Sequence, residues 1–131
     1  SEVLDILLSL NINKAKGPDN ISNKFLKVLA RSLYVPVTKL FNLSLKLCLF
    51  PNIWKCTVVV PLHKKGCKND CNNYRPVALS CCLAKVFEKC VFKYVYNFCI
   101  DNEIISQHQS GFKPGDSTVY QLTELYHVYI V

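Results

Sequence analysis

Four cationic side chains gather around a predicted turn near the middle of the chain, and their types are suited to anion chemistry. Lys64 and Lys65 directly precede Gly66, Lys68 follows it, and Arg75 comes after an asparagine-rich stretch. Lysine ammonium groups act as point charges on phosphate, whereas arginine can bind it bidentately. This spacing favours the binding of a polyphosphate.

Two extended segments are expected to carry these cations. The β-branched run Thr57–Val60 favours a strand, and residues 74–79 form a second extended segment. Glycine, asparagine and aspartate between them supply turn chemistry. Pro61 has no backbone N–H, so we expect its strand to lie at a sheet edge or to pair on one side only. The sequence therefore predicts a β-hairpin with a basic tip.

Most other segments show helical periodicity, which predicts a mainly helical α+β fold. We expect a short helix within residues 1–11, a turn over 14–20, and a helix that includes residues 25–33. Pro36 is predicted to occupy the first turn of a largely buried helix from Val37 to about Leu49. A further helix over 83–98 carries Lys85, Lys89 and Lys93 as a stripe, which is more typical of a solvated face than of a binding site.

The C-terminal third is expected to be a loop followed by a helix. Residues 101–116 form the loop, with a short extended piece over 110–113. Ser117 or Thr118 caps the last helix, with Gln121 in a capping box with Thr118. That helix reaches Val131 without a stop signal, which predicts a piece of a longer protein. No repeat or linker interrupts residues 1–131, so we expect a single unit.

Composition indicates a globular chain with segregated positive charge. Half of the 131 residues are hydrophobic and 19% are charged, with a net charge of +7. Between Lys14 and Lys93 there are 15 Lys and Arg residues against three acids. Such a field favours an anionic partner, most commonly nucleic acid, although a solvated basic surface is the alternative.

The eight cysteines are expected to be reduced and mostly buried, because their spacing matches no common zinc site and no secretory signal precedes them. No apolar run reaches the roughly eighteen residues of a transmembrane helix. We therefore expect a soluble intracellular protein, located in the cytoplasm or nucleus, with no membrane partner.

Familiar catalytic patterns are absent from the sequence. It has no Gly-x-Ser-x-Gly, no Walker loop, and no pair of carboxylates spaced to build a two-metal site. His63, His108 and His127 are interpreted as structural or solvated. We assign no catalytic residue and no metal ligand, so the residues by themselves indicate anion binding.

Several stretches, taken in order, resemble the reverse transcriptases of non-LTR (LINE, jockey-like) retrotransposons over nearly the whole chain. They include Lys16-Gly-Pro-Asp-Asn-Ile21, the segment from Trp54 to Gly66, Asn73-Tyr-Arg-Pro76, Lys85-Val-Phe-Glu-Lys89 and the segment from Gln109 to Thr118. Asn20 stands where the family usually has glycine, and asparagine tolerates the positive φ that such a turn requires. Lys113 stands where the family usually has arginine, which keeps the charge but loses the planar fork.

This resemblance implies roles for particular cations. Lys64, with Lys65 as the neighbouring candidate, and Arg75 would hold the triphosphate of an incoming nucleotide. Lys16, Lys68 and Lys113 are assigned to the template or other nucleic acid. The alternative for Arg75 is a salt bridge to Asp70 or Asp19. We interpret three aromatic residues as core anchors and not as base-stacking platforms: Trp54, Tyr74 and Phe112.

The resemblance also implies what the chain lacks. The family's metal-binding aspartates belong to palm motifs, and neither Phe-x-Asp nor Tyr-Ala-Asp-Asp occurs before Val131. The expected fold is therefore an N-terminal fingers subdomain with an incomplete palm, inactive alone. The parent would use Mg²⁺, none of it bound by these residues, with an RNA template, an RNA/DNA duplex and deoxynucleoside triphosphates as partners, and would supply the missing palm and thumb. A stand-alone nucleic-acid-binding module and a helical protein-interaction domain, either derived from a degenerate element, remain open.

Overall fold

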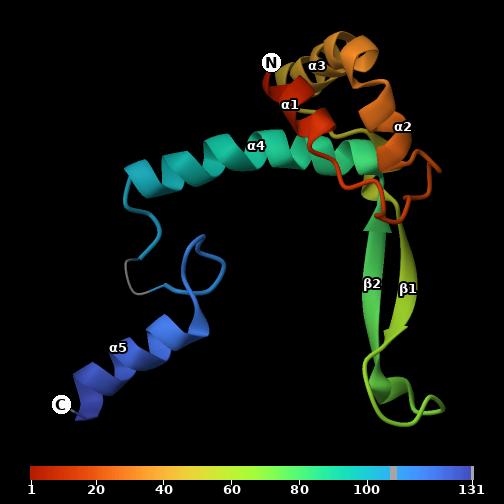
Figure 1. Ribbon diagram of the computed structural model, residues 1–131. Helices are drawn as coiled ribbons and strands as arrows, with labels where there is room; N and C mark the ends of the chain where they lie inside the picture. The colour runs from red at the N-terminus through yellow and green to blue at the C-terminus, as the bar shows by residue number, and fades with distance from the viewer. Residues whose placement is uncertain (107–108, 131) are drawn as a thin grey trace. The chain divides into compact units, whose positions relative to one another are not determined.

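The computed structural model describes residues 1–106 and 109–130, so His108 lies outside the described residues (Figure 1). The described elements are α1 (Glu2–Leu8), α2 (Asn23–Val28), α3 (Ala30–Lys46), η1 (Asn52–Lys55), β1 (Thr57–His63), η2 (Cys71–Asn73), β2 (Tyr74–Ser80), α4 (Cys82–Asp101) and α5 (Thr118–Ile130). Helices predominate and one two-stranded antiparallel sheet accompanies them, which confirms the α+β prediction. The chain divides into two compact units, residues 1–93 and 94–131.

An aromatic cluster forms the core of the first unit. The rings of Phe41, Phe50, Trp54 and Phe87 lie with centroids 5.0–6.0 Å apart. Edge-on and tilted arrangements at such distances are favourable for aromatic pairs. Trp54 is only 6% exposed, which confirms its interpretation as a core anchor. The cluster joins α3 and α4 to the segment that leads into β1.

The predicted helix start at Pro36 is wrong. Pro36 lies inside α3, and the helix break occurs earlier, at Leu29, where φ is −93° and ψ is 11°. A proline inside a helix removes one hydrogen bond and costs about 3 kcal/mol. Ala30, Val37 and Phe41 all bury on one side of α3, so packing against the core keeps the helix continuous through the proline.

The prediction that the helix from Val37 to about Leu49 is largely buried is also wrong. Only a stripe on α3 packs inward, and several leucines on other sides of this helix and just beyond it are exposed: Leu40, Leu43, Leu45, Leu47 and Leu49. A sequence that is apolar on nearly all sides of a helix predicts burial on all sides. Within the described residues, nothing covers these leucines.

The apolar face of α4 is buried along only part of its length. Val86 and Phe87 are buried and Val91 is partly buried, whereas Tyr94 and Phe98 are exposed. At the end of the first unit, the Lys93 ammonium lies 3.4 Å from the carboxylate of Glu2 on α1. One of the three lysines in the predicted solvated stripe therefore pairs with another helix.

The second unit has little core of its own. The expected extended piece over 110–113 is instead a turn, because Phe112 has φ of 63° and Lys113 N–H donates to the Ser110 carbonyl. Phe112 is fully exposed, at 104%, so its interpretation as a core anchor is wrong. Ser117 is the cap of α5, since its hydroxyl accepts the Tyr120 N–H. The capping box based on Thr118 is therefore wrong.

All eight cysteines are free thiols. Cys81 and Cys82 are buried and Cys90 and Cys99 are partly buried, but the other four are exposed: Cys48, Cys56, Cys67 and Cys71. The expectation of mostly buried thiols is therefore wrong for half of them. Among the described helices, none has both the length and the apolarity that a membrane span demands.

Candidate nucleic-acid interface

The pairing of β1 with β2 decides where each cation of the hairpin lies. Pro61 lies opposite Pro76, and Leu62 lies opposite Arg75. Neither proline can donate to the other, so this pair must be of the non-hydrogen-bonded type. The next pair, Leu62 and Arg75, is then a hydrogen-bonded pair. The Lys64 N–H donates to the Asn73 carbonyl over 2.8 Å, which continues the same alternation beyond the strand ends.

Alternation along the strands gives the hairpin two distinct faces. We call one the Arg75 face, and it consists of Val58, Val60, Leu62, Arg75, Val77 and Leu79. The other is the Tyr74 face, and it consists of Thr57, Val59, Pro61, His63, Tyr74, Pro76, Ala78 and Ser80. The alternation places Lys64 with Arg75, so the two cations predicted to hold a triphosphate share one face.

Side-chain hydrogen bonds order the tip of the hairpin. Gly66 adopts φ of 85°, a left-handed conformation that favours glycine. The Asp70 carboxylate accepts the Asn72 N–H and begins η2, while the Asn73 amide donates to the Cys67 carbonyl. The Tyr74 hydroxyl donates to the Lys68 carbonyl over 2.9 Å. These bonds hold the segment that carries Lys68 against the start of β2.

The cations of the hairpin are exposed and carry no ion pair with the described part of the chain. Lys64, Lys65, Lys68 and Arg75 are all exposed. The ion pairs found between described residues join the N-terminus to Asp5 and Lys93 to Glu2. The salt bridge considered for Arg75, with Asp70 or Asp19, is therefore not formed, and the guanidinium is available to an external anion.

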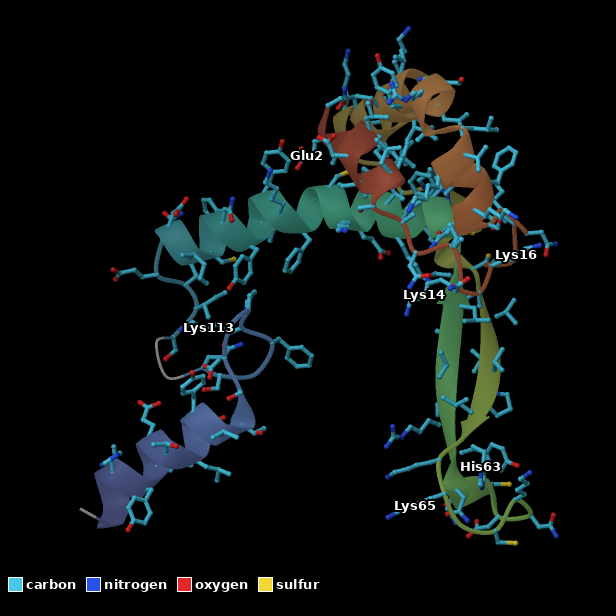
Figure 2. All side chains as sticks on the ribbon, viewed as in Figure 1. Glu2, Lys14, Lys16, His63, Lys65 and Lys113 are labelled. Carbon is cyan, nitrogen blue, oxygen red and sulfur yellow. The ribbon has the colours of Figure 1, made fainter. Side chains whose placement is uncertain are left out.

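Lys16 lies at the opposite end of the hairpin from these four cations. Its neighbour Gly17 is buried, and a Cβ there would lie 2.6 Å from backbone atoms of Ser80 and Cys81, so only glycine allows this close approach. Figure 2 shows Lys16 near the base of the hairpin and Lys65 at its tip. The seven residues from Tyr74 to Ser80 are separated by six steps, which span roughly 20 Å at the rise of a strand.

The turn that carries Lys16 is held by Asn20 and Asp19. Asn20 adopts φ of 56°, which confirms that asparagine supports the turn where the family usually has glycine. The Asp19 carboxylate accepts the Ile21 N–H. Burial raises the pKa of the Cys81 thiol above its ordinary value, and the hydrogen bond and charge of Asp19 raise it further. Cys81 therefore remains a neutral thiol in this buried contact.

Lys113 belongs to the second unit of the chain, whereas the hairpin belongs to the first. It is partly buried and lines a pocket of about 350 Å³ with Ile100, Glu103, Ile105 and Ser106. Of the six predicted cations, the structure thus brings Lys64 and Arg75 onto one face, with Lys65 and Lys68 at the nearby tip. Lys16 is not part of that group, and Lys113 belongs to the other unit.

The donor set does not suit Mg²⁺. Over residues 1–106 and 109–130, no three His, Cys, Asp or Glu side chains come together as a metal site. Magnesium in polymerases needs carboxylates that hold it beside phosphate oxygens. No such cluster of carboxylates occurs over residues 1–106 and 109–130.

Sequence reasoning missed a pocket of about 560 Å³ on the Tyr74 face. It is lined by Val59, Pro61, Lys68, Cys71, Tyr74 and Pro76. The sequence carries only a partial signal, since each strand of the hairpin contains one proline but no residue preference sets Pro61 opposite Pro76. Had the two prolines been paired at that stage, the composition of this face would have followed.

Curated proteins match almost the full length of the chain, and no family model does. A probable RNA-directed DNA polymerase from transposon X-element of Drosophila melanogaster is 34% identical over 92% of the chain and 13% of its own length. A probable RNA-directed DNA polymerase from transposon BS of the same organism is 30% identical over 95% of the chain and 14% of its own length. The RNA-directed DNA polymerase from mobile element jockey is 28% identical over 92% of the chain. The chain thus spans about one seventh of the curated relatives that it matches.

Proposed function

We propose, from the premise that this chain is homologous to a segment of the non-LTR retrotransposon RNA-directed DNA polymerases, that its hairpin binds the triphosphate of an incoming deoxynucleotide. The observation that carries the proposal is the register of β1 and β2, which places Arg75 and Lys64 on one exposed face without an acidic partner among the described residues. Arg75 offers the planar fork that binds phosphate oxygens bidentately, and Lys64 adds a second positive charge.

The rest of the Arg75 face suits the same ligand. Val60, Leu62 and Val77 are exposed beside the cations and provide an apolar surface for a base or sugar. Lys65 and Lys68 extend the positive charge around the tip, and residues 1–93 carry 15 Lys and Arg against five acids. In phosphoryl transfer, fixed cations offset charge on the triphosphate. The hairpin supplies this part of the reaction without the metal ions.

In this proposal residues 1–131 are the N-terminal, fingers part of a reverse transcriptase domain with an incomplete palm. The parent protein would contribute the palm aspartates, the Mg²⁺ ions and the thumb, and would copy an RNA template with deoxynucleoside triphosphates. Lys16, Lys68 and Lys113 would contact the template or the RNA/DNA duplex. This chain by itself would bind its ligands but not polymerise.

Exposed leucines on α3 favour protein contact as a second function. Leu40 and Leu43 on α3 and Leu47, its C-cap residue, follow helical spacing and are 39–53% exposed. Exposed apolar side chains gathered on one side of a helix are typical of an interaction site. In a polymerase fragment its partner would be the remainder of the parent chain, whereas in a protein-interaction domain derived from a degenerate element it would be another protein.

Calorimetric titration with a deoxynucleoside triphosphate tests the proposed function. Arg75→Ala and Lys64→Ala each remove a charge-assisted contact, so each is expected to weaken binding by about 1.5–3 kcal/mol. Arg31→Ala, an exposed arginine on α3, is the matched control and is expected to bind normally. Equal binding by all four proteins, or none by a folded wild-type chain, would refute the proposal.

A further inference from the structure

We propose that the pocket on the Tyr74 face binds an unstacked base, together with its phosphate, of a single-stranded nucleic acid. This inference rests on the proposed function and adds a second binding site to it. The pocket has a volume of about 560 Å³ and lies on the opposite side of the hairpin from Arg75 and Lys64. A triphosphate on the Arg75 face and a strand on the Tyr74 face would therefore not compete for the same surface.

The walls of the pocket are suited to a flat, apolar ligand. Val59, Pro61 and Pro76 supply apolar side chains, and Tyr74 supplies an aromatic ring. Tyr74 is only partly buried and is not part of the hydrophobic core, so its interpretation as a core anchor is wrong. Its ring is held edge-on to His63, with centroids 5.2 Å apart. Nucleic-acid bases stack on aromatic side chains without regard to sequence, because every base has a π-face. The volume also lies in the range of small-ligand pockets.

Charge at the pocket favours an anion beside the base. Lys68 is the charged residue of the lining, and no carboxylate belongs to it. The hydrogen bond from the Tyr74 hydroxyl to the Lys68 carbonyl ties the backbone of this cation to the ring that would stack on the base. A base on the ring and a phosphate near Lys68 would thus be bound by two residues that this hydrogen bond already links.

The hairpin edges argue against a peptide that adds a strand. In the non-hydrogen-bonded pair of Pro61 and Pro76, the backbone nitrogens face outward, and in proline they carry no hydrogen. Each edge of the two-stranded sheet therefore lacks a donor near its centre. Peptides that bind by strand addition depend on such donors. The missing edge donors do not affect a ligand that binds against the Tyr74 face, where the pocket lies.

The reactivity of Cys71 provides a direct test. Cys71 is an exposed thiol that lines the pocket, whereas Cys67 and Cys48 are exposed thiols outside the lining. The 131-residue chain is alkylated with N-ethylmaleimide, with and without an unstructured oligouridylate RNA, and each site is quantified by peptide mass spectrometry. We expect the RNA to slow alkylation of Cys71 several-fold relative to Cys67 and Cys48.

Two variants test the roles of the lining. Tyr74→Leu keeps an apolar side chain but removes the ring, and is expected to weaken RNA binding roughly tenfold. Lys68→Gln is expected to lower the salt dependence of binding by about one phosphate contact. Far-ultraviolet circular dichroism on both variants verifies that the chain remains folded, so a loss of binding can be attributed to the pocket.

The outcome also separates this inference from the proposed function. Protection of Cys71 that persists in Arg75→Ala supports a site independent of the triphosphate. Unchanged Cys71 reactivity at RNA concentrations that saturate binding would overturn the inference and leave the pocket to a side chain of a protein partner. If the triphosphate also fails to bind, the proposed function is refuted with it, whereas triphosphate binding without Cys71 protection refutes the pocket alone.

Discussion

Replacing Gly17 with alanine would place a methyl group against the backbone that joins β2 to α4. The added Cβ would lie 2.6 Å from the Cα and N of Cys81 and from the carbonyl carbon of Ser80. That is roughly 1 Å short of the separation preferred by carbon atoms. These neighbours are backbone atoms at the start of a helix, so they cannot rotate away as a flexible side chain could.

The expected cost follows from this geometry. Overpacking of a well-packed site costs about 1–3 kcal/mol, and the contact with backbone favours the upper part of that range. With a urea m-value of about 2 kcal/mol/M, a loss of 2 kcal/mol lowers the unfolding midpoint by about 1 M. Trp54 is the single tryptophan and lies in the core, so its fluorescence reports unfolding of the first unit.

Gly111→Ala is the matched control for this experiment. An added Cβ at Gly111 meets no atom within 4 Å, so the substitution is expected to change stability by less than about 0.5 kcal/mol. Gly17→Ala with a wild-type urea midpoint would show that the loop carrying Lys16 does not pack against Cys81 as described. The placement of Lys16 at the base of the hairpin would then fall with it.

Further predictions concern other parts of the fold. Asn20→Ala is expected to cost about 1–2 kcal/mol in urea unfolding, because alanine is disfavoured at φ of 56°, while Asn20→Gly should be nearly neutral; equal losses would refute the reasoning. Phe87→Ala removes the ring that contacts three others and is expected to cost about 3–5 kcal/mol, and a loss below 1 kcal/mol would contradict the aromatic core. Ser117→Ala removes the cap of α5 and should lower helicity by circular dichroism, with a cost of about 0.5–2 kcal/mol; unchanged helicity would show that the cap is dispensable. Stability should fall as the pH rises above about 9, because the folded state raises the pKa of Cys81 and so favours its protonated form; Cys81→Ala should make this decline shallower, and an identical pH profile would exclude the thiol as its cause.

The local chemistry of the sequence was sufficient to predict the hairpin. The run Thr57–Val60 favours a strand, and Gly66 with its asparagine neighbours favours a turn, so the two strands and their connection were expected before any tertiary contact was known. Asn20 was likewise predictable, because tolerance of positive φ is a property of the residue itself. The resemblance to non-LTR retrotransposon reverse transcriptases, drawn from motifs in order along the chain, is confirmed by the curated relatives.

Errors arose where tertiary packing overrides local preference. Pro36 is a strong helix-start signal, yet burial of Val37 and Phe41 on one side keeps α3 continuous through it. Phe112 is apolar but fully exposed, because no described part of its unit covers it. The exposed leucines of α3 also look like core residues in the sequence, and no described residue covers them either. A single sequence does not indicate whether an apolar face is covered by its own chain or by another segment.

The sequence indicated which cations to consider for the candidate site but not how they are arranged. The four hairpin cations were identified from charge and turn chemistry. The placement of Lys64 with Arg75 on one face depends on the register of Pro61 with Pro76, which no residue preference specifies. The separation of Lys16 from the tip likewise depends on the length of the strands. Both features follow from pairing and become visible only once the hairpin is formed.

Fluorescence anisotropy of an RNA/DNA primer–template duplex tests the central claim most directly. Binding is measured between about 50 and 200 mM salt, because each phosphate contact contributes close to one unit to the logarithmic salt slope. We predict that wild-type binding weakens with salt and that Lys68→Gln binds more weakly with a slope smaller by about one, while Arg31→Ala behaves as wild type. A folded wild-type chain that does not bind, or a Lys68→Gln slope equal to that of wild type, would contradict the account.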